Sequence, residues 1–380
     1  MKRIIDLDAN ATTRMLPEVI NAVCGAMRAG HGNSSSSHGL GKAAGRAVGE
    51  ARGAVAELIG ADVDEVIFVP SATAAINLAV LGHLGAARKR DRRLSVFLSR
   101  LEHMAVLKAV QAANRKGLAR VTVLPSGEHG EARPLDAHIP DHIDLVCVFH
   151  GNNEIGTLND LVALSNFAKA AGARLFVDAA QTGAYCPVRV DQLPVDLACI
   201  SAHKMHGPLG AAALYVRRDT PMQPILFGGG QEKGLWPGTL NVPALVGFGV
   251  AARLARTFGA ARVAQVERLR ELLWNELLRE VPDAILNGHP TNRLPGNLSI
   301  TIPFVPVEVL QRRLPGLAFS RGSACASDSG GPSHVLSGLG LGPEEARWTI
   351  RLGVSTLTRE QDVIQAGRQI GRCAKAIRGW

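Results

Sequence analysis

The sequence predicts an α/β fold: a large domain with a mostly parallel, seven-stranded sheet flanked by helices, plus a small α+β domain. Two observations predict it. Short apolar runs alternate with helical patterns through the first two thirds of the chain, which is typical of parallel strands joined by crossover helices. These runs are continuously apolar instead of alternating with polar residues, which indicates a sheet buried on both faces. After Asn241 the pattern changes to one long amphipathic stretch followed by mixed elements.

Seven apolar runs are the strand candidates of the large domain, and three helical patterns lie between them. Each run is short enough for a strand, and each helical pattern repeats its apolar residues at helical spacing. The expected strands are Val66–Val69, Leu94–Leu98, Val121–Leu124, Ile143–Phe149, Arg174–Val177, Asp196–Ile200 and Ala212–Val216. The expected helices are Ala72–Ala87, Ala105–Lys116 and Leu161–Ala171.

The remaining elements form the small domain. Pro243–Val281 is a long amphipathic stretch that is consistent with one helix or two. We expect the large domain to span residues 14–250, and the small domain to combine residues 1–13 and 251–380. The other elements expected after residue 281 are strands at Asn297–Ile302, Leu317–Ser320 and Trp348–Gly353, a helix at Pro306–Leu314 and a final helix from Arg359.

Composition excludes several classes of protein. With 46% hydrophobic and 20% charged residues in 380, the chain can bury a sizeable core. The net charge of +9 would favour anionic partners, but the basic residues are scattered, so direct nucleic-acid binding is not predicted. No apolar stretch is long enough to span a membrane, and the N-terminus lacks a secretory apolar segment, so we expect a cytoplasmic protein.

The 6 cysteines contain no C-x-x-C pair, so neither a metal site nor a redox dithiol is predicted. Cys147 and Cys199 lie inside apolar runs and are expected to be small core residues. A reducing setting would keep a lone thiol reduced.

Asp178 and Lys204 carry the strongest functional signal. Asp178 ends one apolar strand with Gln181 close behind, and Lys204 follows the next strand in Ser201-Ala202-His203-Lys204. Alone, such a lysine would be a solvated charge and such an aspartate a helix cap. Together, at the carboxyl ends of neighbouring strands, they form the layout of a pyridoxal phosphate pocket, where the carboxylate keeps the pyridine nitrogen protonated.

Other polar residues follow strand ends. Ser201 and His203 offer donors for phosphate oxygens. Ser71-Ala72-Thr73 opens a helix whose N–H groups could cradle phosphate, although for that tripeptide alone an ordinary capped helix is the better explanation. His103 could stack over a planar cofactor or play a structural part.

Two residues late in the chain also suggest chemistry. Cys325 lies in a loop of small polar residues, a good position for a nucleophile and a poor one for packing. Arg351 lies in an apolar strand, where burying it is costly without a partner; that partner could be a substrate carboxylate or a structural ion pair.

Read in order, the motifs resemble the cysteine desulfurases of the NifS/IscS type, within the class-V aminotransferases and the fold-type I pyridoxal phosphate enzymes. The resemblance covers nearly the whole chain. Each motif is weak alone, whereas their order and spacing are specific. The motifs are Leu7–Thr13, Gly32–His38, Ser71–Thr73, Glu102-His103, Asn152–Gly156, Val177–Gln181, Ser201–Lys204, Gly238-Thr239, Gly322–Cys325 and Arg351.

The resemblance implies a role for each matching residue. Lys204 would form the covalent link to pyridoxal 5'-phosphate, Asp178 would pair with the ring nitrogen and Gln181 with the ring hydroxyl. His103 would stack on the ring and move protons. Cys325 would take sulfur from L-cysteine as a persulfide, leaving L-alanine. The residues expected to complete the phosphate site are Ala72, Thr73, Ser201, His203 and, from the partner subunit of a homodimer, Thr239. Those expected near the substrate are Asn153, Arg351 and Asn33, and Asn153 is also expected to contact the cofactor.

The acceptor and some details differ from the common pattern. A sulfur-acceptor protein is implied, and the chain ends soon after its final helix, which favours a specialised role such as nucleic-acid sulfur modification or biosynthesis. Ala74, Gln231, Lys233 and Trp236 replace the usual residues of this pattern, and the sequence leaves open whether they alter substrate scope or dimer contacts. The alternative function is a selenocysteine lyase, another C–S lyase or an aminotransferase of the same fold; a further class, a cofactor-free nucleic-acid-binding protein, rests on charge alone.

Overall fold

A computed structural model describes residues 3–30, 32–88, 92–134, 142–322 and 333–379. Its main feature is the expected seven-stranded sheet, in which β8 alone runs antiparallel to its neighbours β2 and β7. The predicted strand bounds agree with the structure to within two residues. In spatial order the strands are β2 (Val66–Val69), β8 (Ala212–Val216), β7 (Leu197–Ser201), β6 (Arg174–Asp178), β5 (Leu145–Phe149), β3 (Leu94–Ser99) and β4 (Ala119–Leu124).

Helices cover both faces of this sheet, which explains the continuously apolar strands. Alternate residues of each strand join different clusters: Val146 and Val148 of β5 face one side, and Leu145 and Cys147 the other. The first face packs against α1 (Pro17–Arg28), α2 (Gly39–Ile59), α6 (Leu161–Ala170) and part of α7. The second packs against α3 (Ala72–Asn77), the π-helical η2 (Leu78–Gly82), α4 (His83–Ala87) and α5 (Met104–Arg115).

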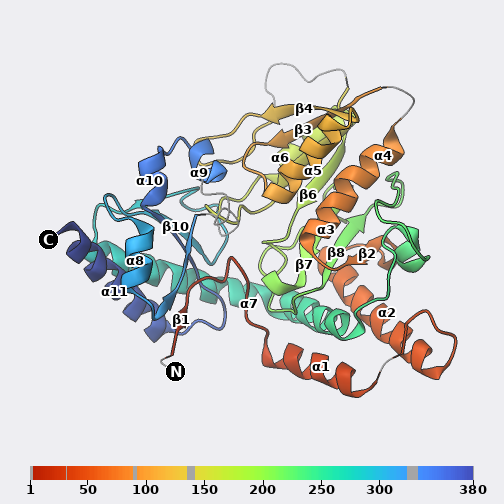
Figure 1. Ribbon diagram of the computed structural model, residues 1–380, viewed down its shortest axis with the longest axis horizontal. Coiled ribbons are helices and arrows are strands. Elements are labelled where there is room, and N and C mark those ends of the chain that lie inside the picture. The colour runs from red at the N-terminus through yellow and green to blue at the C-terminus, as the bar shows by residue number, and fades with distance from the viewer. Residues whose placement is uncertain (1–2, 31, 89–91, 135–141, 323–332, 380) are drawn as a thin grey trace.

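The long helix α7 (Val242–Glu280) joins the two parts of the molecule (Figure 1). It is one continuous helix, and the Asn241 side chain caps it by accepting a hydrogen bond from Ala244 N at 3.2 Å. Its first half packs in the core beside the large sheet, and its second half packs against the C-terminal elements. The predicted domain boundary at residue 250 falls inside this helix; the division itself stays a prediction.

The C-terminal elements surround a four-stranded sheet, in the order β12 (Ser320–Arg321), β13 (Thr349–Gly353), β10 (Asn297–Thr301) and β9 (Ile285–Leu286). The single strand expected at Leu317–Ser320 was wrong. The chain changes partner at the buried Phe319, so that β11 (Leu317–Ala318) pairs with the N-terminal β1 (Ile5–Asp6) and β12 pairs with β13. The helices here are α8 (Val307–Arg313), α9 (His334–Gly338), α10 (Pro343–Arg347) and α11 (Glu360–Arg378).

Short 3-10 turns complete the fold: η1 (Val63–Glu65), η3 (Ala202–Lys204) and η4 (Gln231–Gly234). Within the described ranges, no helix has the length and apolarity needed to cross a membrane.

Candidate active site

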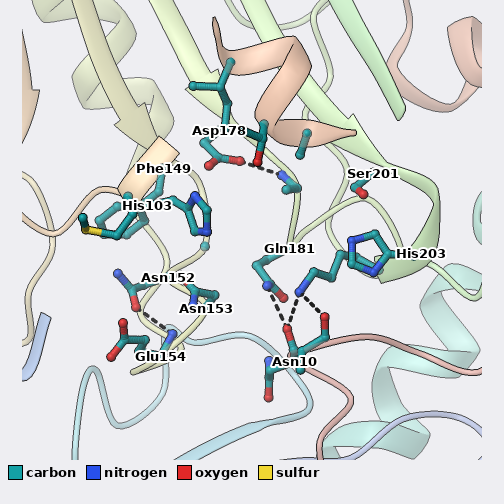
Figure 2. Close-up of a pocket in the computed structure, with 18 of the residues that line it drawn as sticks. Asn10, His103, Phe149, Asn152, Asn153, Glu154, Asp178, Gln181, Ser201 and His203 are labelled. Carbon is teal, nitrogen blue, oxygen red and sulfur yellow. Dashed lines mark hydrogen bonds between the residues drawn. The ribbon is translucent and has the colours of Figure 1, made fainter. Parts of the chain in front are cut away.

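A cavity of about 300 Å³ opens at the carboxyl ends of the parallel strands, between the large sheet and the C-terminal elements. Residues that follow β3, β5, β6 and β7 line it because parallel strands end at the same edge of a sheet. Figure 2 shows His103 and Phe149 on one side of this cavity and Ser201 and His203 on the opposite side. The N-terminal segment contributes Asn10.

Asp178 is the last residue of β6 and is 7% exposed. Its Oδ1 accepts hydrogen bonds from Ala180 N and from the Cys199 thiol, each at 3.0 Å. The described residues place no donor on Oδ2. The carboxylate is therefore fixed on one edge, and its second oxygen is left for a ligand of the cavity.

Lys204 lies in η3, directly after β7, and reaches the N-terminal segment. Its Nζ donates hydrogen bonds to the carbonyl oxygens of Asn10 and, at 2.8 Å, of Ala11. Gln181 Nε2 also donates to the Asn10 carbonyl, at 3.1 Å (Figure 2). These contacts hold the amine and the amide of two different strand ends at the same wall.

His103 stands at the end of the β3–α5 connection and caps α5, with Nδ1 accepting a hydrogen bond from Ala105 N at 3.1 Å. Burial lowers the pKa of His103, and the positive charges of Lys204 and His334 act in the same direction, against that of Asp178. The imidazole is therefore neutral near pH 7, and because Nδ1 accepts, its proton resides on Nε2.

Glu102 is fully buried behind His103, and its Oε1 accepts a hydrogen bond from Phe149 N at 2.7 Å. Burial, reinforced by the nearby charge of Asp178, raises the pKa of Glu102 well above its ordinary value. Its protonated form is therefore favoured relative to that of an exposed carboxyl group.

Three further polar residues line the cavity: Ser201, His203 and Thr73. Ser201 is 1% exposed, and its Oγ has no hydrogen-bond partner among the described residues. Burial, followed by the charge of Lys204, lowers the pKa of His203 to about 4, so this ring is neutral. Thr73 lies in the first turn of α3, where Ser71 Oγ caps the helix by accepting from Ala74 N at 3.1 Å. These residues offer neutral hydrogen-bond donors to the cavity, and the Ser201 hydroxyl has no partner among the described residues.

Arg351 lies in β13 and is 1% exposed. One terminal nitrogen donates to Asp8 Oδ1 at 3.0 Å, and the other donates to the Asn153 carbonyl at 3.1 Å. The Arg351 Nε atom has no hydrogen-bond partner within the described part of the chain. The structural ion pair anticipated as one alternative is thus present, and one donor remains for a ligand.

Residues 5–365 match the family model described as aminotransferase class-V. The chain belongs to the class-V aminotransferase family. Among the most similar relatives, a protein named cysteine desulfurase IscS from Anaeromyxobacter sp. (strain K) is 38% identical over 384 residues, covering 100% of this chain and 94% of that protein.

Solved structures of similar proteins agree with this membership. A structure described as a NifS-like protein has a TM-score of 0.88 at 29% identity, covering 97% of this chain and 98% of the other. A structure described as SspA in complex with cysteine has a TM-score of 0.80 at 28% identity, covering 92% of this chain and 99% of the other. The fold is therefore that of the NifS-like fold-type I enzymes.

Most of the site residues predicted from the sequence line this cavity. They are Ala72, Thr73, His103, Asn153, Asp178, Gln181, Ser201, His203, Lys204 and Arg351. Two do not line it within the single chain. Asn33 is exposed after α1, and Thr239 is exposed beside a separate hollow bordered by Phe68 and Trp236. Cys325 lies outside the described residues.

Sequence reasoning assigned no role to several residues of the cavity. Asn10 and Ala11 supply carbonyl oxygens to Lys204, a contact that no side-chain pattern could reveal. His334 also lines the cavity, and its Nε2 lies 2.9 Å from the Glu102 carbonyl. No sequence motif pointed to His334; in the structure, the preceding Ser333 caps the helix and donates a hydrogen bond to the buried Glu154.

Proposed function

We propose that this protein is a pyridoxal-phosphate-dependent cysteine desulfurase that converts L-cysteine to L-alanine and passes sulfur to an acceptor. The observation that carries the proposal is the convergence of Asp178, Lys204, His103 and Arg351 on one cavity. Full-length relatives at 38% identity bear the name cysteine desulfurase. A buried carboxylate, an amine, a neutral imidazole and a guanidinium are the groups that amino-acid chemistry on this cofactor requires.

The residues present fit the cofactor. The buried Ser201 Oγ has no hydrogen-bond partner within the described residues, and neutral His203 and Thr73 line the same cavity, a donor set that suits phosphate oxygens. Asp178 lines the cavity, its Oδ2 accepts no hydrogen bond from the described residues, and it would hold a protonated ring nitrogen. Gln181 would approach the ring hydroxyl, and Lys204 would hold the cofactor covalently.

When bound, the cofactor supplies an electron sink for the pair left when the substrate loses its Cα proton. Lys204, released by the substrate, would take that proton as a general base. Neutral His103, with its proton on Nε2, would donate and recover a proton during the reaction. Arg351 and Asn153 would hold the substrate carboxylate, for which Arg351 Nε is the donor that lacks a partner among the described residues.

Sulfur transfer requires a nucleophile, and we propose Cys325. Its thiolate would attack the substrate sulfur, forming an S–S bond while the C–S bond breaks. The electron pair of that bond stays on the carbon fragment, which is protonated to alanine, and Cys325 retains a persulfide. This chemistry needs a reduced thiol and therefore suits a reducing, cytosolic setting.

We also propose a homodimer and a separate sulfur-acceptor protein. Thr239 is exposed and lies outside the cavity of its own chain. In a dimer this threonine would reach the phosphate site of the partner subunit. Asn33, equally exposed, would approach the substrate only if its segment moves or the assembly closes over it.

Mass spectrometry after incubation with L-cysteine tests the function. We expect alanine in solution and one additional sulfur on the Cys325 peptide. Lys204→Ala should lose the visible absorbance of the bound cofactor and all turnover, whereas Cys325→Ser should keep the absorbance and release no sulfide. Formation of a keto acid in place of alanine, or normal sulfide release by Cys325→Ser, would contradict the assignment.

A further inference from the structure

Cys199 lies directly beside the carboxylate that the cofactor is proposed to need. The two residues are register partners in the parallel strands β6 and β7, so their side chains leave the sheet on the same face. The thiol Sγ donates to Asp178 Oδ1 at 3.0 Å. From the sequence, Cys199 was expected only to fill the core.

The thiol is a permanent donor in this place. Cys199 is fully buried, and burial together with the adjacent Asp178 charge raises its pKa well above the ordinary value, so it stays protonated. A backbone N–H from Ala180 acts on the same Oδ1 atom. Two donors on one oxygen restrain the carboxylate, and Oδ2 of this cavity-lining residue accepts no hydrogen bond from the described residues.

We propose that Cys199 is a positioning residue of the cofactor site: its S–H group orients the Asp178 carboxylate and, as a weak donor, leaves most of the negative charge available to the ring nitrogen. The proposal rests on the proposed function, in which Asp178 pairs with that nitrogen. A hydroxyl in the same place would bind Oδ1 more strongly and withdraw more charge. An apolar side chain would donate no hydrogen bond and would not orient the Asp178 carboxylate.

Cys147 provides a matched control. It is equally buried, belongs to the same apolar cluster and faces the same side of the sheet, but its register partner is Phe176, one pleat below Asp178. Replacing either cysteine by alanine removes one buried sulfur. Only Cys199→Ala removes a donor from Asp178.

The first measurement is the S–H stretching band of the protein in infrared difference spectra, assigned with Cys199→Ala and Cys147→Ala. We expect the Cys199 band at lower frequency than the Cys147 band, because donation to a carboxylate weakens the S–H bond. Adding pyridoxal phosphate should move the Cys199 band and leave the Cys147 band in place. Coincident bands that do not respond to the cofactor would overturn the proposal.

The second measurement is cofactor affinity, followed by fluorescence titration of protein stripped of cofactor. Cys199→Ala should weaken binding about three- to tenfold, the range expected for one hydrogen bond, and Cys199→Ser should recover part of it. Cys147→Ala should bind like the wild type. Equal affinities for the two alanine variants would overturn the positioning role alone, whereas a wild-type protein that takes up no pyridoxal phosphate would overturn the proposed function itself.

Discussion

His103 combines a structural and a chemical task in one side chain. Its Nδ1 caps α5 through Ala105 N, and burial keeps the ring neutral, with the proton on the nitrogen that is not used for the cap. The two tasks can be separated because asparagine is a good helix cap and lacks an acid–base group near pH 7.

Two substitutions of His103 should therefore differ in stability but lose turnover equally. The free energy of unfolding of His103→Asn should lie within about 0.5 kcal/mol of the wild-type value because asparagine keeps the helix cap, whereas that of His103→Ala should be about 1 kcal/mol lower. Both should reduce alanine formation by about 100-fold, the lower end expected for a general acid–base group. Urea unfolding and product assays measure the two effects. An asparagine variant with near-normal turnover would limit His103 to capping.

Among the elements, the η4 turn is a strained backbone segment that is anchored by one buried ion pair. Both Glu232 and Lys233 adopt positive φ angles, of 48° and 59°, which L-residues rarely do. Glu232 is held by a bidentate pair with Arg52 at 2.7 and 2.6 Å and by Phe68 N at 2.6 Å. The turn carries Gln231 and Lys233, the residues that differ from the family pattern, and the anchor lies between them.

Glu232→Gln should lower the free energy of unfolding by about 3 kcal/mol, because removing one partner leaves the Arg52 charge uncompensated. The Glu232 side chain is 2% exposed and that of Arg52 is 18% exposed, so solvent screens the pair little. The control is Glu57→Gln on the same helix as Arg52, since the Glu57–Arg256 pair is 59% and 53% exposed. That change should cost no more than about 0.5 kcal/mol.

Urea unfolding of the two variants, read by circular dichroism, makes the comparison. Equal and small losses would show that backbone hydrogen bonds, not the ion pair, hold the strained turn.

The elements also show which parts of the fold a sequence can predict. Strands buried on both faces give continuous apolar runs, and their bounds were predicted well. The helix α2 gave no such signal because Gly39, Gly41, Gly45, Gly49 and Gly53 lower its intrinsic helix propensity. Packing on α7 compensates: a Cβ at Gly249 would meet the Ala51 Cα at 2.6 Å, so the two backbones approach closely. Because tertiary contacts stabilise this helix pair, the local sequence of α2 could not predict the helix.

At the scale of the whole molecule, the N-terminal segment contacts both the C-terminal elements and the strand ends that line the cavity. Strand β1 pairs with β11, Asn10 and Ala11 contact Lys204, and Thr13 Oγ1 donates to the His203 carbonyl at 2.9 Å. The sequence indicated Lys204, Asp178 and Arg351 by residue type and strand position. It could not reveal that backbone carbonyls from the N-terminal segment receive the lysine, because carbonyls have no sequence signature.

The contact between Asp8 and Arg351 joins the N-terminal segment to β13, and it makes Asp8 a competitor of the substrate carboxylate for Arg351. Asp8 Oδ1 accepts from Arg351 at 3.0 Å, and Asp8 Oδ2 accepts from Ser320 Oγ at 2.7 Å. Asp8 therefore neutralises the guanidinium that we propose for the substrate carboxylate. The Asp8 side chain is 26% exposed, so its charge is partly screened while that of the buried arginine is not.

We expect Asp8→Asn to lower the KM for L-cysteine with little change in kcat, because the uncompensated Arg351 charge attracts the substrate carboxylate more strongly. Arg351→Gln should raise the KM by about tenfold, the loss of roughly 1.4 kcal/mol of charge-assisted binding. Ser320→Ala removes the other side-chain hydrogen bond that Asp8 makes with the described residues without changing the charge, and its KM should stay at the wild-type value. Steady-state alanine formation measures all three. A higher KM in Asp8→Asn would show instead that Asp8 orients Arg351 for the substrate, and the ion pair would then assist binding, not compete with it.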